Sequence, residues 1–401
     1  MNWDDAKDIY RISDRRIAEI DCTWHRSLYG RINWCNRLIG LKGPRGVGKT
    51  TLLLQHLRES FADTAKVLYA SLDNLWFATH NLHDLADYHY THGGEVLVID
   101  EVHYAKDWQR LVKNIYDDFP RLAIVYTGSS MLKIDFDSGD LSRRHVLYAM
   151  QGLSFREYLS LEGFAELAPV PLEDLLSNHV AIAGPIVSRI KVLAAFDDYL
   201  RRGYYPFFRE PGSGYGDRIR QMAGQVLESD WPAVENITPA TIRKARKMLM
   251  VLAGQPPQTP KLSRLADELE IDRKQAIRML KMLEKAGLLA LLGSGSDDLK
   301  NLSRPDKIYC DNPNLMAALV PETDMGTLRE CFFVNQVRSG HALAYPPAGD
   351  VLVDGKWLFE IGGRKKSFAQ IKDIPNSYLA VADTEIGRGN RIPIWMFGLL
   401  Q

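Results

Sequence analysis

The sequence predicts an α/β protein with a doubly wound parallel sheet in its first part. Three observations lead to this. Short apolar runs without alternation recur before residue 151, separated by helix-compatible stretches, and such runs are typical of strands buried on both faces. The region after Gln151 is helical, and strand candidates return near the end of the chain. The five early runs are residues 37–41, 67–72, 96–99, 122–126 and 146–150.

The remaining elements are expected in a fixed order. A helix is expected at residues 5–20, before the first strand, and the helical region contains helices at 159–176 and 182–200. A Gln-Pro-Pro-Gln-Thr-Pro break at 255–260 separates a helix at 242–253 from a group that is typical of a winged helix-turn-helix. That group comprises helices at 262–269 and 273–286 and strands at 288–292 and 307–310. The last strands are expected at 351–353, 357–361, 378–382 and 394–397.

Composition excludes several protein classes. The chain has 401 residues, 46% hydrophobic and 25% charged, which is the range of globular proteins with two to four compact units. Lys plus Arg equals Asp plus Glu, so any basic surface must be local. The four cysteines form no CxxC or Cys/His cluster, which argues against a zinc site or a disulfide framework. No stretch approaches the roughly 18 apolar residues of a membrane span, and we expect a cytoplasmic protein without a membrane anchor.

A glycine-rich segment follows the first strand candidate and precedes a helix at 50–58. It matches the P-loop pattern, in which backbone N–H groups and the helix N-terminus surround phosphate groups. Lys49 is expected at the β- and γ-phosphates of ATP, and the Thr50 hydroxyl at Mg²⁺. The predicted nucleotide-binding residues of this segment are Gly43, Pro44, Arg45, Gly46, Val47, Gly48, Lys49, Thr50 and Thr51.

Two acids end the strand candidate at 96–99, at the sheet edge where ligands of such folds bind. Asp100 is expected to hold Mg²⁺, and Glu101 to activate the attacking water. The next strand candidate runs into Thr127-Gly128-Ser129-Ser130, where we choose Ser129 as the residue that senses the γ-phosphate. A plain helix-capping role for Ser129 or Ser130 stays open.

These motifs occur within a longer resemblance. GPRGVGKTTLLLQ, VLVIDEVHYAKDW, YTGSS and LSRRHVLYAMQGLSFREYL together resemble the prokaryotic AAA+ ATPases that carry a winged helix and a C-terminal domain distantly like restriction endonucleases. The resemblance runs from about residue 16 to residue 401. It implies a five-stranded core in the order 5-1-4-3-2 and an arginine finger at Arg143 or Arg144 acting on a neighbouring subunit. The finger implies a homo-oligomer, either a ring such as a hexamer or an open oligomer. For the two arginines, a solvated surface position is the competing interpretation.

The resemblance also implies a domain division. An AAA+ core would span residues 1–158, a helical lid 159–236, a winged helix 237–312 and a small α/β endonuclease-like domain 313–401. In the lid, Gly203-Tyr204-Tyr205-Pro206 looks like a turn that packs near the adenine, so Tyr205 and Pro206 are expected at the nucleotide. Read from the residues alone, the same turn is a helix terminator.

The C-terminal segment departs from the endonuclease pattern. Asp350 and Glu360 have the spacing of a metal-binding acid pair, but Gly362 stands where the pattern requires a lysine, and Lys365 and Lys366 are displaced. We expect this domain to have no nuclease activity.

Basic residues concentrate in the winged-helix segment. Between residues 241 and 290 there are eleven Lys and Arg against five Asp and Glu, an excess of six in a neutral chain. On the second helix of the motif the spacing places Lys274, Arg278, Lys281 and Lys285 on one face, where they could neutralise DNA phosphates. A solvated face or a protein contact is the competing interpretation. The candidate DNA-binding residues are Arg273, Lys274, Arg278, Lys281 and Lys285.

The sequence thus predicts a Mg²⁺-dependent oligomeric ATPase coupled to DNA binding or remodelling. The alternative is a nucleotide-dependent regulatory or defence-type switch that acts on a protein partner. Asp100-Glu101-Val102-His103 also matches the DExH pattern of helicases, but a second α/β core is missing after Gln151. GTP specificity is disfavoured because the chain has no Asn-Lys-x-Asp motif.

Overall fold

The computed structural model describes residues 1–129, 141, 143–212, 214–257, 261–294 and 305–401. The chain forms two compact units, which we describe separately. The first comprises Met1–Gln151 with the short segment Ser229–Asn236, and the second comprises Gly152–Glu228 with Ile237–Gln401. The predicted division into four domains stays a prediction, and residues 258–260 of the predicted break at 255–260 lie outside the described ranges.

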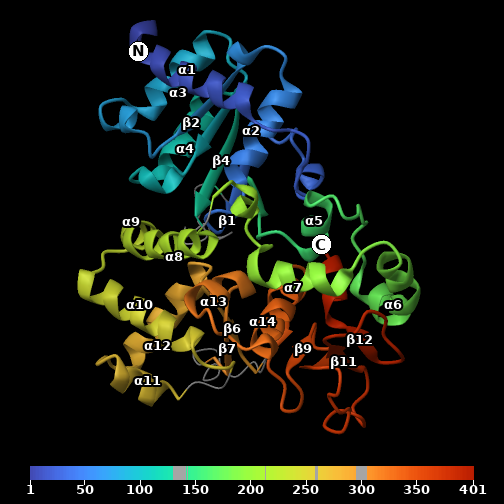
Figure 1. Ribbon diagram of the computed structural model, residues 1–401. Helices are drawn as coiled ribbons and strands as arrows, with labels where there is room; N and C mark the ends of the chain where they lie inside the picture. Colours follow the sequence, from blue (N-terminus) through green and yellow to red (C-terminus); the bar gives the residue numbers. More distant parts are fainter. Residues whose placement is uncertain (130–140, 142, 213, 258–260, 295–304) are drawn as a thin grey trace. The chain divides into compact units, whose positions relative to one another are not determined.

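The first unit contains a five-stranded sheet in which all neighbouring strands are parallel (Figure 1). The strand order is β2-β3-β4-β1-β5, which confirms the expected order and all five strand positions to within a few residues. The strands are β1 (Leu38–Gly43), β2 (Val67–Ser71), β3 (Val96–Asp100), β4 (Ala123–Ser129) and β5 (Val146–Ala149).

Helices cover both faces of this sheet, as the absence of alternation in the strands predicts. In Figure 1, α2 lies on one side of the strands and α3 and α4 lie on the other. All five residues of β3 are buried. The helices of this part are α1 (Trp3–Glu19), α2 (Lys49–Ser60), α3 (Leu82–Thr91) and α4 (Trp108–Asp118), with 3₁₀ turns η1 (Tyr29–Arg31), η2 (Thr64–Lys66), η3 (Leu75–Ala78) and η4 (Val102–Tyr104).

The second unit begins with helices whose predicted bounds are partly wrong. The expected helix at 159–176 is interrupted, because Gly163 adopts a left-handed φ of 74° and Pro169 and Pro171 follow it. The expected gap at 177–181 is helical instead, with a kink at Asn178. The helices are α5 (Phe155–Leu161), α6 (Leu172–Val187), α7 (Val192–Arg202), η5 (Pro206–Arg209) and α8 (Tyr215–Gln225).

The segments predicted as a winged helix-turn-helix form in the predicted order. Two helices joined by a turn at Glu270 precede an antiparallel pair of strands. The apolar face of the second helix, which includes Met279 and Leu283, is buried. The elements are α10 (Pro239–Ala253), α11 (Leu262–Glu268), α12 (Arg273–Lys285), β6 (Leu289–Leu292) and β7 (Lys307–Cys310).

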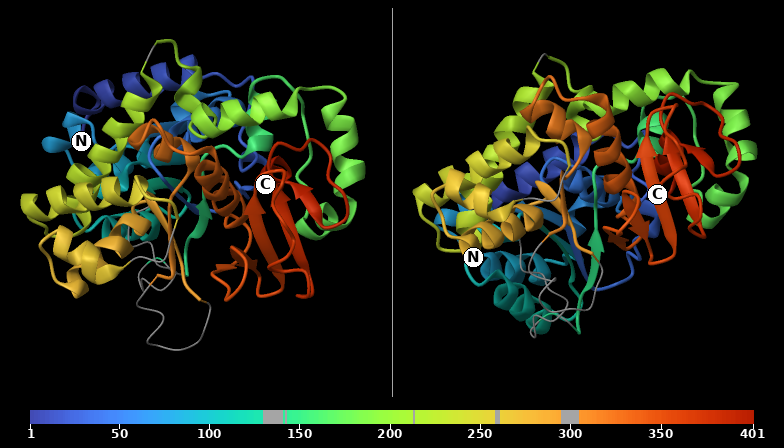
Figure 2. Two further views of the ribbon diagram at one scale, coloured as in Figure 1. Left: turned by 60° about the horizontal axis from the view of Figure 1, so that its bottom comes forward. Right: turned by 90° about the horizontal axis from the view of Figure 1, so that it is seen from below.

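A second five-stranded sheet, of mixed direction, lies near the end of the chain (Figure 2). Its order is β12-β11-β10-β9-β8, with α14 packed against β10. The prediction of a strand at 394–397 is wrong, because the segment is a 3₁₀ helix, η7 (Ile394–Leu399). All its residues are buried, so the sequence has no alternation of apolar and polar residues that would distinguish a helix from a strand. The other elements are α13 (Pro313–Leu319), α14 (Met325–Val337), β8 (Leu343–Ala344), β9 (Val351–Val353), β10 (Trp357–Gly362), β11 (Ser377–Val381) and β12 (Arg391–Pro393).

Among the described helices, none by itself has both the length and the apolar character needed to cross a membrane. Only α6 and α7 taken together meet those two criteria, and the chain bends by 96° between them.

Candidate nucleotide-binding site

The loop between β1 and α2 is shaped by its glycines. Gly46 and Gly48 have φ values of 80° and 95°, in the left-handed region that favours glycine. At Gly43 a Cβ atom would lie 2.1 Å from the carbonyl oxygen of Met150, so no larger residue fits without a shift of the backbone. The loop leads directly into the first residues of α2, where helix N–H groups have no partner within the helix.

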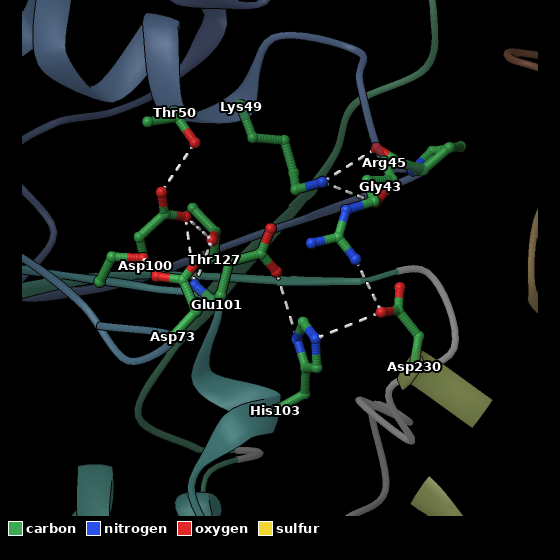
Figure 3. Close-up of polar contacts among 12 residues, drawn as sticks. Gly43, Arg45, Lys49, Thr50, Asp73, Asp100, Glu101, His103, Thr127 and Asp230 are labelled. Atoms are coloured by element: carbon green, nitrogen blue, oxygen red, sulfur yellow. Dashed lines mark hydrogen bonds and ion pairs between the residues drawn. The ribbon is translucent and has the colours of Figure 1, made fainter. Parts of the chain in front are cut away.

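Lys49 is the first residue of α2, directly after this loop. Its side chain is buried, and Nζ donates hydrogen bonds of 2.9 Å to the carbonyl oxygens of Gly43 and Pro44 (Figure 3). Burial lowers the pKa of Lys49, while the nearby carboxylates of Glu101 and Asp100 oppose this shift. A buried ammonium group at a helix N-terminus attracts anions, because both the charge and the helix dipole are positive there.

Asp100, the last residue of β3, is buried at 2% exposure and accepts several hydrogen bonds. The Thr50 and Tyr69 hydroxyl groups each donate to its Oδ2 over 2.7 Å, and the Thr127 hydroxyl donates to its Oδ1. Tyr69 in turn accepts a hydrogen bond of 2.7 Å from Arg16 of α1. The carboxylate is therefore held beside the Thr50 hydroxyl by residues from β2, β4 and α2.

Glu101 follows Asp100 in a left-handed conformation with φ of 54°, which is uncommon for a residue other than glycine. Its N–H donates to Oγ1 of Thr127 over 3.0 Å. Its carboxylate lies between Lys49 and His103, as Figure 3 shows, with Oε2 3.2 Å from Nδ1 of His103. Burial raises the pKa of Glu101, and Lys49 opposes the shift. A carboxylate in this environment is suited to accept a proton.

The site also contains a residue distant in sequence. Asp230 comes from the segment Ser229–Asn236, and its carboxylate Oδ1 lies 2.9 Å from a guanidinium nitrogen of Arg45. The same oxygen lies 3.6 Å from Nε2 of His103. Burial works against the charge of Arg45, but Asp230, Tyr104 and Glu101 together outweigh it, so the pKa of Arg45 is raised.

The structure brings together most of the predicted nucleotide residues in the first unit. Residues 43–51 form one continuous loop and helix start, and Thr50 of this segment contacts Asp100 directly. Thr51 is exposed and Val47 is buried. Their role in binding ATP stays a prediction, as do the assignments of Thr50 and Asp100 to the metal and of Glu101 and Lys49 to catalysis.

The two arginines before β5 have different surroundings. Arg143 is exposed. Arg144 is half-buried and its Nε lies 3.1 Å from Oδ1 of Asp117, on α4 of the same unit. The finger role predicted for this pair is therefore easier to assign to Arg143, and it stays a prediction.

Two predicted nucleotide residues belong to the second unit. Tyr205 is a buried residue of the second unit, where its hydroxyl accepts a hydrogen bond of 3.0 Å from Asn312, and Pro206 begins η5. Their nucleotide role stays a prediction. The backbone of Ser129 ends β4, but its side chain and all of Ser130 lie outside what the structure describes.

Sequence reasoning missed several residues of this site. Tyr69 is hidden in a buried strand, and Asp230 is 185 residues from its partner Arg45. His103 was visible in the DExH-like run, and Thr127 in the run that contains Ser129, but neither was assigned a role. Only the proximity of separate strand ends could have indicated Thr127.

The five candidate DNA-binding residues on α12 are all exposed, whereas most of the apolar residues of the same helix are buried. The basic residues of α10 differ. Lys244 and Lys247 donate to the carbonyl oxygens of Glu270 and Glu268 over 2.7 and 2.8 Å, at the end of α11. These two lysines stabilise a helix terminus.

The acids of the C-terminal sheet are paired with lysines. Lys366 extends back from its loop, so that Nζ lies 2.6 Å from the buried carboxylate of Glu360. Its side chain occupies the space beside Gly362, where an added Cβ would lie 2.7 Å from Cδ of Lys366. Asp350 is paired with Lys307 at 3.1 Å. The predicted absence of nuclease activity stays a prediction.

Comparisons with known proteins find two family models and one relative that match this chain. A family model described as an AAA domain matches residues 35–159, and a model described as a domain of unknown function matches residues 193–326. An uncharacterised protein of Methanocaldococcus jannaschii, MJ1637, is 30% identical over 367 residues, which is 83% of this chain and 77% of that protein.

Solved structures resemble the chain only distantly. ORC1 of Aeropyrum pernix in complex with DNA aligns with 79% of this chain and 92% of its own, at 13% identity and a TM-score of 0.33. AMPPCP-bound DnaA of Aquifex aeolicus aligns with 69% and 88%, at 16% identity and a TM-score of 0.27. Similarity at this level carries no argument about function.

Proposed function

The chain belongs to the family of the M. jannaschii protein MJ1637 and contains an AAA domain, and on this basis we propose that it binds and hydrolyses ATP in a Mg²⁺-dependent manner. The observation that carries the proposal is the convergence of Lys49, Thr50, Asp100 and Glu101 at one edge of a parallel sheet. Such an edge is where ligands of open α/β sheets bind.

Each group has a distinct part in the proposed reaction. The loop N–H groups and Lys49 bind the phosphates, and the Thr50 hydroxyl and Asp100 carboxylate supply oxygen atoms of the kind that Mg²⁺ prefers. When bound, Mg²⁺ would neutralise charge on the phosphates. Glu101 orients the attacking water and accepts its proton, for which its raised pKa is favourable.

We further propose that ATP turnover is coupled to DNA and takes place in a homo-oligomer. The support for DNA is the exposed basic face of α12, which is suited to phosphate contacts. The support for an oligomer is Arg143, whose exposed position suits a contact with a neighbouring subunit's nucleotide. A regulatory switch acting on a protein partner remains the alternative, and it predicts slow turnover that DNA does not change.

Two substitutions test the ATPase proposal. Lys49→Ala should abolish ATP binding, because the loop loses its buried cation. Glu101→Gln should retain ATP binding, since the side chain keeps its shape, while turnover falls roughly 10²- to 10⁴-fold as general-base action is lost. Binding is measured with a fluorescent ATP analogue and turnover as phosphate release with Mg²⁺.

The control is Glu95→Gln, which removes an exposed acid paired with Lys66 at the opposite end of β3 and should leave both quantities unchanged. Wild-type affinity in Lys49→Ala, or wild-type turnover in Glu101→Gln, would contradict the proposed site.

A further inference from the structure

The segment Ser229–Asn236 belongs to the first unit, although the chain on both sides of it belongs to the second. The chain enters it through a π-helical turn, Val226–Asp230, and continues into the short helix α9 (Trp231–Val234). Isolated π-helical turns are rare and occur frequently at functional sites. Within the segment, the Trp231 side chain is buried and its Nε1 donates to Glu235 over 3.1 Å. The segment is therefore a packed part of the first unit.

Asp230 is the residue that this segment contributes to the nucleotide edge. Its side chain is 2% exposed, so its charge requires a partner. Arg45, from the loop before α2, provides that partner at 2.9 Å. Arg45 is one of the residues expected at the phosphates, and the nucleotide would thus share this guanidinium group with Asp230.

His103 connects the same carboxylate to Glu101. Its ring is buried, with Nδ1 3.2 Å from the Glu101 carboxylate and Nε2 3.6 Å from the Asp230 carboxylate (Figure 3). Within the ranges that the structure describes, neither ring nitrogen makes a well-aligned hydrogen bond. The two nitrogens of the His103 ring face the Asp230 and Glu101 carboxylates. The ring is therefore positioned to orient the Glu101 carboxylate, as a third group orients the catalytic base in other active sites.

We propose that Asp230 is a positioning residue for ATP hydrolysis: it holds Arg45 and His103 and, through His103, fixes the direction of the Glu101 carboxylate. This inference rests on the proposed ATPase function. The chain passes from the second unit into the segment and back again. A displacement of that segment therefore changes the contacts of Asp230 with Arg45 and with His103 at once. Asp230 then makes hydrolysis depend on the position of the segment, while nucleotide binding depends mainly on Lys49 and the loop.

The test is Asp230→Asn, which keeps the volume and removes the charge. Without the charge of Asp230, the His103 and Glu101 side chains lose their fixed orientation. The kcat for ATP should then fall roughly 10- to 100-fold, as a displacement of about 1 Å at a reacting group can cause. The Kd for the ATP analogue should stay within about threefold. His103→Gln should show the same split between kcat and Kd. The double variant should be little worse than either single one, because the two residues act in one line.

Conservative and matched variants separate positioning from structural support. Asp230→Glu should recover part of the turnover, since it restores the charge. Glu228→Gln, in the same π-helical turn but exposed and paired with Arg246, should behave as wild type. If Asp230→Asn does not fold, His103→Gln carries the same test.

The outcomes distinguish the two proposals. If Glu101→Gln hydrolyses ATP as fast as the wild type, the proposed function is wrong. If Glu101→Gln is slow while Asp230→Asn and His103→Gln keep wild-type kcat, only the positioning role is wrong. Equal losses of kcat and ATP affinity in Asp230→Asn, together with a lower melting temperature, would likewise overturn the positioning role and leave Asp230 as a structural residue.

Discussion

Replacement of Lys307 by Met should destabilise the second unit. Lys307, in β7, has a side chain only 8% exposed, and Nζ lies 3.1 Å from both the Glu330 and the Asp350 carboxylates. Methionine fills a similar volume but leaves two largely buried acids without their cation. Removing one partner of a buried ion pair costs about 3–5 kcal/mol. Because these acids are still 24% and 19% exposed, and the Ile361 N–H continues to donate to Asp350, we expect the lower end, about 3 kcal/mol.

The loss should depend on pH in a defined direction. Burial raises the pKa of Glu330, and the positive charge of Lys307 opposes that shift. A carboxyl group whose pKa is higher in the folded than in the unfolded state binds its proton more tightly when the protein is folded. Stability therefore increases as the pH falls from the folded-state pKa toward the unfolded-state pKa. Without Lys307 the pKa rises further. The difference in stability between variant and wild type should therefore shrink as the pH is lowered from neutrality.

Urea denaturation followed by circular dichroism measures this loss at each pH. The matched control is Lys356→Met: Lys356 pairs with Glu173 over 2.9 Å, but the two side chains are 53% and 69% exposed, so the loss should not exceed about 1 kcal/mol. Equal losses in the two variants would refute the reasoning, as would a loss in Lys307→Met that is independent of pH.

Two predictions concern assembly and DNA. If Arg143 acts on the nucleotide of a neighbouring subunit, Arg143→Ala should lower turnover by about 10³-fold while ATP binding is retained. Mixing this variant with Lys49→Ala should restore part of the turnover. No rescue in verified mixed oligomers would contradict this role. Arg144→Ala, which breaks the pair with Asp117, should have a much smaller effect. If α12 binds DNA phosphates, replacing Lys281 by Gln should weaken binding equally for all sequences and reduce the slope of log K against log salt by about 1; an unchanged slope in fluorescence anisotropy titrations would exclude a phosphate contact by this residue.

The core strands were predictable because they are short, apolar and bounded by turns. Asp100 and Glu101 could be placed at the sheet edge for the same reason, since the run from Val96 to Ile99 must be a buried strand. In contrast, the run from Ile394 to Phe397 is buried on all sides in a 3₁₀ helix, and a fully buried segment carries no period that distinguishes helix from strand.

The part of the candidate site that was missed depends on contacts between distant residues. Asp230 and Arg45 are 185 residues apart, and no local pattern around Asp230 indicates that a π-helical turn will bring it to the loop. Lys366 is similar: its loop position was expected, but its return to Glu360 depends on the space left open by Gly362. Such contacts are set by tertiary packing, which a single sequence does not reveal.

The hydrogen bond from Arg16 to Tyr69 has a practical consequence for how the protein is divided into fragments. Ser13 and Arg16 belong to α1, and both support Tyr69, which in turn donates to Asp100. A fragment cut at the start of the AAA match, residue 35, lacks both supports. Low ATP turnover in such a fragment would reflect the loss of the Ser13 and Arg16 contacts with Tyr69. The activity of this domain should therefore be measured on the chain from residue 1.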